Sequence, residues 1–425
     1  MSAALGRLRG SLGSIALSST MLLPATVVPG LAAFAGMVVL SHVSGLRTVG
    51  LMSLARVAGS VGASMIAEAP SLGVQRSLAA QGADRAAAYR WALVRRSLAF
   101  VPIGVAAGAA IALWRPSVGI PFALGSLLMV PEGLFTFESA VFRYHGRFVM
   151  ASAYASTRSV AAWAAVVAVA AVTGSFLLIG LAYLGALLVV GASFVLPRPI
   201  PVDEWTRREL RESWRSLASY NLASNALNNG DQYLLALIAG PATVGLYSLG
   251  YMIGGGVVAL VAEPVTGVIG PRIIRSWGSG GDGRERAYSM ARSWALAIGV
   301  LGLTMAAGVW LAGYLGWLDF VSTNPDLRWI AAVVAAAIGF HIAASVSFQT
   351  ILYLQRQTGL LSRSAWVALI VSVPAVVGLT LAFGVIGTAV ATFVSYGVMA
   401  LFQVVAAARY RDREGTGGAG PAPGG

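Results

Sequence analysis

Cysteine and lysine are both absent from this 425-residue chain, and its three histidines are scattered. Without cysteine, disulfides, thiolate metal ligands and cysteine nucleophiles are excluded. Three isolated histidines do not form an all-histidine metal site either. We therefore expect neither a metal centre nor a cofactor.

Charged residues are also scarce, at 11% of the chain, whereas 57% of residues are apolar and the mean hydropathy is +0.77. The apolar residues form blocks of about 20, the number of helical residues that crosses a hydrocarbon core of about 30 Å. These blocks predict an all-α integral membrane protein with twelve transmembrane helices. The expected spans are 21–40, 48–67, 97–114, 118–140, 156–173, 176–196, 217–239, 243–263, 293–313, 329–350, 364–383 and 385–407. The apolar run 160–196 is too long for one span, so we expect it to fold back at Gly174 and Ser175.

All 29 basic residues are arginine, and they give a net charge of +13. Twenty-five of them are expected in the two termini and in every second connection, and three (Arg47, Arg115 and Arg328) in the opposite connections. Arg56 alone is expected deep within a span. By the positive-inside rule both termini are cytoplasmic, and the basic charge is an orientation signal that contacts anionic lipid rather than nucleic acid.

An internal repeat divides the chain. Residues 48–54 (Thr-Val-Gly-Leu-Met-Ser-Leu) recur as residues 243–249 (Thr-Val-Gly-Leu-Tyr-Ser-Leu), and the match continues through Gly59 and Gly254. With six spans per half, the repeats enter the membrane from the same side and form two parallel six-helix lobes around a central cavity. An internal duplication in a membrane protein is typical of transporters.

The expected parts of the chain follow from this division. They are an N-lobe over 1–198 that retains its first span, an amphipathic cytoplasmic linker over 199–215, a C-lobe over 216–408 and a disordered cytoplasmic tail over 409–425.

Span 217–239 carries a polar stripe. Its members are Asn221, Asn225, Asn228, Asp231 and Gln232. Because an amide facing lipid has no hydrogen-bond partner, the stripe must face protein or a wet cavity. Hydrogen bonding between helices is the simpler interpretation, but five polar groups exceed what packing requires, so we expect this stripe to line the cavity.

Three further intramembrane groups are candidates for function. Arg56 either contacts an anionic group of the substrate, forms an ion pair with Asp231 or Glu132, or reaches to the outer interface. Glu132 and His341 are candidates for coupling transport to protons or cations, although a lone histidine is more often satisfied by its packing partners.

Two glutamates, Glu68 and Glu263, occupy equivalent positions of the repeat at the cytoplasmic ends of their spans. They form either a symmetric inner gate or, as a simpler interpretation, neutralise nearby arginines such as Arg76 and Arg272.

A resemblance to a known family rests mainly on residues 220–272. This segment contains Tyr220-Asn221, Asp231-Gln232-Tyr233, the run from Val244 to Tyr251 and Pro271-Arg272. Here the chain resembles the polysaccharide-export branch (Wzx-type flippases) of the multidrug/oligosaccharidyl-lipid/polysaccharide exporter (MOP) superfamily. Tyr251, in the tyrosine-rich part of this segment, joins the candidate cavity residues.

The resemblance implies a flippase of lipopolysaccharide or exopolysaccharide assembly in the bacterial plasma membrane. It would move a lipid-linked oligosaccharide from the inner to the outer leaflet by rocking of the lobes. The implied partners are this substrate, membrane lipids and polysaccharide assembly enzymes, and no enzymatic activity is expected.

Two alternatives remain. A multidrug antiporter of the same superfamily typically has an acidic residue in its first span, and residues 21–40 contain none. A membrane polymerase or glycosyltransferase usually needs a large outer loop or an acid-rich site, whereas the longest outer connection here, 314–327, has about 14 residues.

Overall fold

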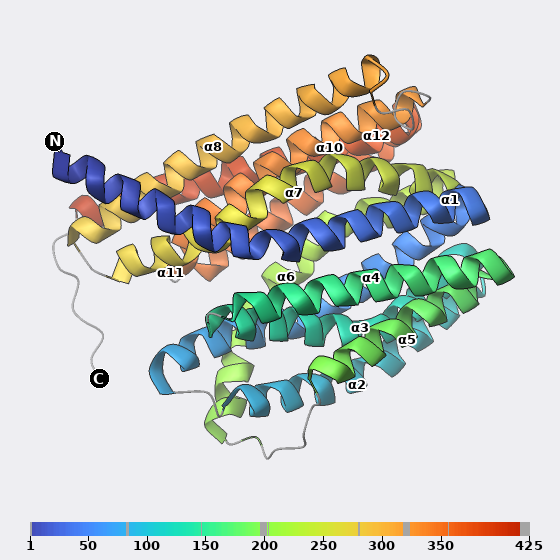
Figure 1. The fold of residues 1–425 in the computed structure, drawn as a ribbon, viewed down its shortest axis with the longest axis horizontal. Helices are drawn as coiled ribbons and strands as arrows, with labels where there is room; N and C mark the ends of the chain where they lie inside the picture. The colour runs from blue at the N-terminus through green and yellow to red at the C-terminus, as the bar shows by residue number, and fades with distance from the viewer. Residues whose placement is uncertain are drawn as a thin grey trace.

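The computed structural model describes residues 2–81, 85–145, 147–195, 202, 204–278, 281–317, 324–355 and 357–416, and within these ranges the secondary structure is helical (Figure 1). In the N-terminal half the helices are α1 (Ser2–Gln81), α2 (Arg85–Ala112), α3 (Pro116–Tyr144), α4 (Phe148–Thr173) and α5 (Phe176–Phe194). In the C-terminal half they are α6 (Glu204–Ala239), α7 (Pro241–Gly278), α8 (Gly281–Tyr314), α10 (Pro325–Ala344), the π-helical turn η1 (Ser345–Gln349), α11 (Thr350–Leu354) and α12 (Thr358–Thr416).

Glycines mark the points where the chain reverses. Gly174 adopts a left-handed conformation (φ 59°) directly after α4, and α5 begins at Phe176, which confirms the expected reversal. Within α1 and α12, Gly45 (φ 81°) and Gly384 (φ 60°) have non-helical backbones, so each element consists of two helices. Figure 1 shows α1 running to one end of the molecule and back.

Nine helices of the described chain are long and apolar enough to cross a membrane, which makes this a multi-pass membrane protein. α1 and α12 are each counted once in that number, and the polar α6 is not included. The fold class is therefore confirmed, while the count of twelve spans stays a prediction.

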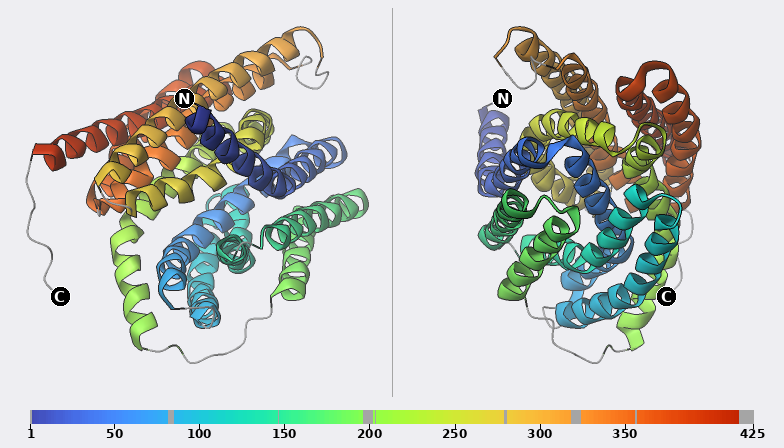
Figure 2. Two further views of the ribbon diagram at one scale, coloured as in Figure 1. Left: turned by 60° about the vertical axis from the view of Figure 1, so that its left-hand side comes forward. Right: turned by 90° about the vertical axis from the view of Figure 1, so that its right-hand side faces the viewer.

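Two groups of helices form the molecule (Figures 1 and 2). In the first, α3 and α4 pack on α1, α2 packs on α3, and α5 packs on α4. In the second, α10 packs on α7, α8 and α12, and α12 also packs on α6. We call the first group the N-lobe and the second the C-lobe, and the contact of α1 with α7 joins them.

Three expected boundaries differ from the structure. The predicted linker is helical from Glu204 and continues without a break into the polar stripe, because its amphipathic pattern extends the same helix. α12 continues to Thr416, so it overlaps the predicted tail, and residues 417–425 lie outside the described residues. α4 begins at Phe148, eight residues before the expected span, so Arg158 lies ten residues into the helix instead of near its start.

The repeated Thr-Val-Gly segment forms the contact between the lobes. A side chain at Gly50 would overlap the carbonyl oxygen of Pro241, and a side chain at Gly245 would overlap the carbonyl oxygen of Leu46. The start of α7 and the middle of α1 thus touch backbone to backbone in a nearly symmetric way. Because Gly50 follows the reversal at Gly45, this contact lies at the end of the molecule away from the start of α1 (Figure 1). We call it the glycine contact.

Candidate substrate cavity

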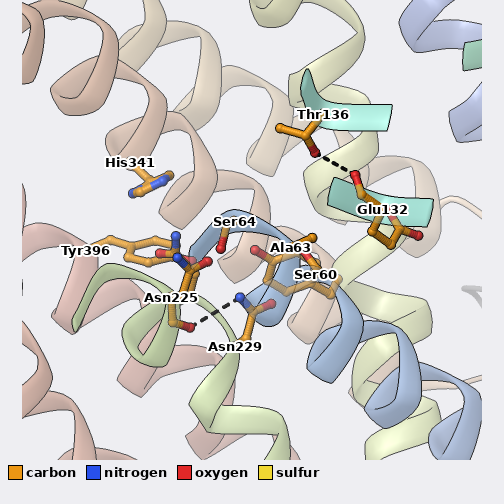
Figure 3. A pocket seen from close by; sticks show the side chains of 11 residues that line it. Ser60, Ala63, Ser64, Glu132, Thr136, Asn225, Asn229, His341 and Tyr396 are labelled. Atoms are coloured by element: carbon orange, nitrogen blue, oxygen red, sulfur yellow. Dashed lines mark hydrogen bonds between the residues drawn. The ribbon is translucent and has the colours of Figure 1, made fainter. Parts of the chain in front are cut away.

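A polar cavity of about 340 Å³ lies between the lobes (Figure 3). The N-lobe contributes residues of α1 and α3, and the C-lobe contributes residues of α6, α7, α10 and α12. The lining residues are Ser60, Ala63, Ser64, Glu132, Thr136, Asn225, Asn228, Asn229, Tyr251, His341 and Tyr396. We call this space the central cavity. Ser60 follows Gly50 by ten residues, or about 15 Å of helix, so the cavity lies on the side of the glycine contact towards the end of α1.

The sequence predicted part of this lining. Of the expected cavity residues, Asn225, Asn228 and Tyr251 line it, and the coupling candidates Glu132 and His341 line it as well. Their helices come from both halves of the chain, so the structure brings together groups that the sequence separates by up to about 200 residues.

Two buried polar atoms in the cavity lack protein partners. Neither the Asn228 Oδ1 atom nor the His341 Nδ1 atom makes a hydrogen bond with any described residue. The His341 ring stacks on Tyr396 with a centroid distance of 4.5 Å. A buried unpaired acceptor or donor costs free energy of about 1–3 kcal/mol, so both atoms are positioned to accept a hydrogen bond from, or donate one to, water or a ligand.

The rest of the polar stripe is used inside the C-lobe. Asp231 is 4% exposed, and its Oδ2 atom accepts hydrogen bonds from the hydroxyls of Tyr247 (2.5 Å) and Thr392 (2.9 Å). Gln232 and Asn221 are also buried, and neither lines the cavity; the Ser248 hydroxyl donates to Gln232 at 3.4 Å. The prediction that all five residues line the cavity is therefore wrong for these three, because the stripe is wider than the cavity that it borders.

Arg56 does not lie where the sequence suggested. Its guanidinium carbon is 5.3 Å from the centre of the Trp163 ring on α4, and it is not among the cavity residues. Both of its expected ion-pair partners are engaged elsewhere: Asp231 by hydroxyls and Glu132 by Arg158. A cation over an indole face is stabilised by the ring quadrupole, so Arg56 has a packing partner within its own lobe.

Arg158 of α4 is a half-buried arginine that was not among the expected intramembrane residues. Arg158 Nη2 lies 2.5 Å from Glu132 Oε1, and the two side chains are 12% and 18% exposed. The guanidinium also lies 4.1 Å from the centre of the Phe135 ring. The expectation that Arg56 is the single intramembrane cation is therefore wrong. The expectation failed because α4 begins in a polar stretch, before the apolar run from which the span was predicted.

Glu138, six residues after Glu132 on α3, forms a second ion pair in the N-lobe. Its carboxylate is 1% exposed and receives two hydrogen bonds from Arg90 of α2, one of them 2.9 Å long. Each described carboxylate in the membrane part of α3 is thus matched by an arginine from a neighbouring helix.

Several residues that line the cavity were not among the expected ones, although the sequence contains a weak indication of them. Ser60 and Ser64 are four residues apart on one face of α1, and Asn229 follows Asn225 by one helical turn. The side chain of Asn229 donates to the Asn225 carbonyl at 3.2 Å, and Thr136 donates to the Glu132 carbonyl at 3.0 Å (Figure 3).

The proposed inner gate is not tested. The side chains of Glu68, Glu263 and Arg76 lie outside the described part of the structure. Among the described residues no group of three or more histidine, aspartate or glutamate side chains is arranged to hold a metal ion.

Comparison with known proteins supports the resemblance found in the sequence. The family model described as "Polysaccharide biosynthesis protein" matches residues 148–277, a range that contains the segment 220–272. No curated protein sequence matches this chain.

Several solved structures share the fold. The lipid II flippase MurJ in an inward closed conformation aligns with a TM-score of 0.64 at 11% identity, over 89% of this chain and 87% of its own. An outward-facing multidrug resistance MATE transporter of the MOP superfamily has a TM-score of 0.60 at 15% identity, covering 95% and 96%. A MOP transporter from Pyrococcus furiosus, described as having a binding pocket of reversed polarity, has a TM-score of 0.60 at 13% identity, covering 95% and 96%. The protein thus has the fold of MOP-superfamily transporters, and the resemblance is confirmed.

Proposed function

We propose that this protein is a transporter that moves a lipid-linked oligosaccharide from the inner to the outer leaflet of a bacterial plasma membrane. The observation that carries the proposal is the central cavity, which is polar and is lined by both lobes. The matched polysaccharide biosynthesis family supports a saccharide substrate, and the shared fold with a lipid II flippase supports a lipid carrier. We propose that both termini are cytoplasmic, as the arginine distribution predicts.

The chemistry of the lining suits a saccharide. Three asparagines, a threonine, two serines, two tyrosines and a histidine offer donors and acceptors in one space. Glu132 is the one carboxylate among the described lining residues and is compensated by Arg158, so these residues give the cavity little net charge. Sugar hydroxyls are neutral and both donate and accept hydrogen bonds, and they satisfy such groups better than an organic cation does.

The position of the glycine contact supports alternating access. In this state the lobes touch at Gly50 and Gly245, on the outer side of the cavity in the proposed orientation. Rocking of the lobes would separate this contact and expose the cavity to the outer leaflet. A flippase needs these two states, because the head group must reach the cavity from one side and leave it on the other.

The test is leaflet sidedness of a labelled polyprenyl-diphosphate oligosaccharide in proteoliposomes. We expect protein-dependent transfer for the wild type, at least a tenfold slower rate for Asn228→Leu, and near-normal transfer for Asn228→Gln, which keeps the amide. Absence of transfer by the folded wild type would contradict the proposal.

A multidrug antiporter is the second candidate, since MATE transporters share the fold. The same proteoliposomes, loaded with a fluorescent organic cation and given a proton or sodium gradient, test it. Gradient-driven efflux without transfer of the lipid-linked saccharide would assign the protein to that class.

A further inference from the structure

Two apolar grooves flank the central cavity. The first, of about 450 Å³, lies between the second half of α1, α2, α3 and α6, and we call it the α1–α6 groove. The second, of about 490 Å³, lies between the first half of α1 and α7, and we call it the α1–α7 groove. Apart from a few polar atoms, both are lined by aliphatic, aromatic and glycine residues.

The α1–α6 groove adjoins the central cavity. Asn225 and Asn229, one helical turn apart on α6, each line both spaces, so the two spaces meet along this turn. At its other side the groove is bordered by Phe100 and Ile103 of α2, which are 40% and 64% exposed on the face that the bilayer covers. The groove therefore lies between the polar cavity and the lipid.

The α1–α7 groove is connected differently. Tyr251 is the one described residue that lines both this groove and the central cavity. Tyr251 is held among other aromatic residues, with its ring centroid 6.0 Å from that of Tyr247. This junction therefore presents an aromatic side chain and no amide.

We propose that the hydrocarbon chain of the lipid-linked substrate lies in the α1–α6 groove while its saccharide head occupies the central cavity. This inference rests on the proposed function and adds the route of the lipid. An amphiphile with its head in a polar cavity needs an apolar exit for its chain, since burying a polar lining against hydrocarbon is unfavourable. The α1–α6 groove supplies that exit with amides at the point where head and chain meet.

Gly230 offers a direct way to block the groove. It lines the α1–α6 groove, lies within the regular helix α6, and a side chain built on it meets no atom within 4 Å. A phenylalanine at this position would extend into the groove without striking the protein backbone. Gly256 of α7 is the matched control, because it lines the α1–α7 groove and is equally unobstructed.

The experiment compares binding of two compounds with the same diphosphate oligosaccharide head, one on a long polyprenyl chain and one on a short, water-soluble prenyl chain. We expect Gly230→Phe to weaken binding of the long-chain compound at least tenfold and to leave the short-chain compound unchanged. Normal short-chain binding also shows that the variant is folded. Gly256→Phe is expected to leave both unchanged.

The outcomes separate the inference from the proposed function. If the wild type binds both compounds but Gly230→Phe does not weaken the long-chain one, the inference is overturned while the function stands. That result would mean that the groove holds a bilayer phospholipid or nothing specific. A selective loss with Gly256→Phe instead would place the chain in the other groove. A wild type that binds neither compound overturns the proposed function and this inference together.

Discussion

The two lobes share backbone contacts but differ in buried charge. At equivalent positions of the repeat, Gly59 packs against Leu128 of α3 and Gly254 packs against Ala331 of α10, each where a side chain would not fit. The N-lobe pairs two glutamates of α3, the buried Glu138 and the half-buried Glu132, with arginines. In the C-lobe, Asp231 instead receives hydrogen bonds from hydroxyl groups.

This difference indicates which properties the duplication preserves. Close helix packing depends on the absence of a side chain, so it survives at both copies of each glycine. Polar groups depend on their partners, and these have diverged. Arg56 of the N-lobe packs on Trp163, whereas Tyr251 at the equivalent C-lobe position lines the central cavity. The framework is nearly symmetric, and the cavity is not.

The largest expected effect comes from breaking an ion pair of the N-lobe. Arg158→Met leaves the half-buried Glu132 carboxylate in the cavity without its cation, and we expect the free energy of unfolding to fall by about 3 kcal/mol. Thermal unfolding in detergent measures the change. The double variant Arg158→Met with Glu132→Gln should recover most of the loss, because no uncompensated charge remains. Equal unfolding temperatures for the single and double variants would contradict the pairing.

The glycine contact should respond next. Gly245→Val places a side chain against the Leu46 carbonyl, and such overpacking costs about 1–3 kcal/mol in the closed state. The equilibrium should shift towards separation of the lobes at that end. Because the chain has no cysteine, Ser64→Cys introduces a single thiol that reports access to the central cavity. If Gly245→Val destabilises the closed state by about 1.4 kcal/mol, we expect labelling of this thiol from the outer side to rise about tenfold.

The matched control for this prediction is Gly185→Val. Gly185 lies on α5, and a side chain built on it meets no atom within 4 Å, so labelling should not change. A similar rise in both variants would show that the label reports general loosening instead of separation at the glycine contact.

Asp231 provides the counterpart in the C-lobe. Asp231→Asn keeps an oxygen that accepts from Tyr247 and Thr392, but an NH2 group replaces the oxygen that accepts from the Gln232 backbone N–H, so we expect a loss of about 1 kcal/mol. Glu138→Gln should be more damaging, because Arg90 loses its carboxylate. Thermal unfolding of the two variants side by side gives the comparison, and a larger loss for Asp231→Asn would reverse it.

Arg56→Gln is expected to have the smallest effect. Loss of the contact with Trp163 should lower the free energy of unfolding by about 0.5–1 kcal/mol, and transfer of the lipid-linked saccharide should continue at the wild-type rate. If Arg56→Gln abolished transfer of the lipid-linked saccharide without changing the unfolding temperature, Arg56 would be a substrate contact after all.

The sequence predicts the framework better than the contacts. The lengths of the apolar blocks predict the helices, and Gly174 predicts the reversal between α4 and α5. Both features depend on local composition and backbone freedom. Of the polar stripe, Asn225 and Asn228 line the central cavity. The pairing of Glu132 with Arg158 could not be predicted, because a stripe shows which face of a helix is polar but not which helix it meets. Asp231 and Gln232 were assigned wrongly for the same reason.

The most direct test of the account is whether substrate changes the side from which the central cavity is reached. In sealed, oriented vesicles carrying Ser64→Cys, we expect an impermeant thiol reagent to label the protein from the side of the termini in the absence of substrate. Addition of a lipid-linked oligosaccharide should slow that labelling and permit labelling from the opposite side. Labelling from one side only, unaffected by the substrate, would contradict alternating access of a saccharide through this cavity.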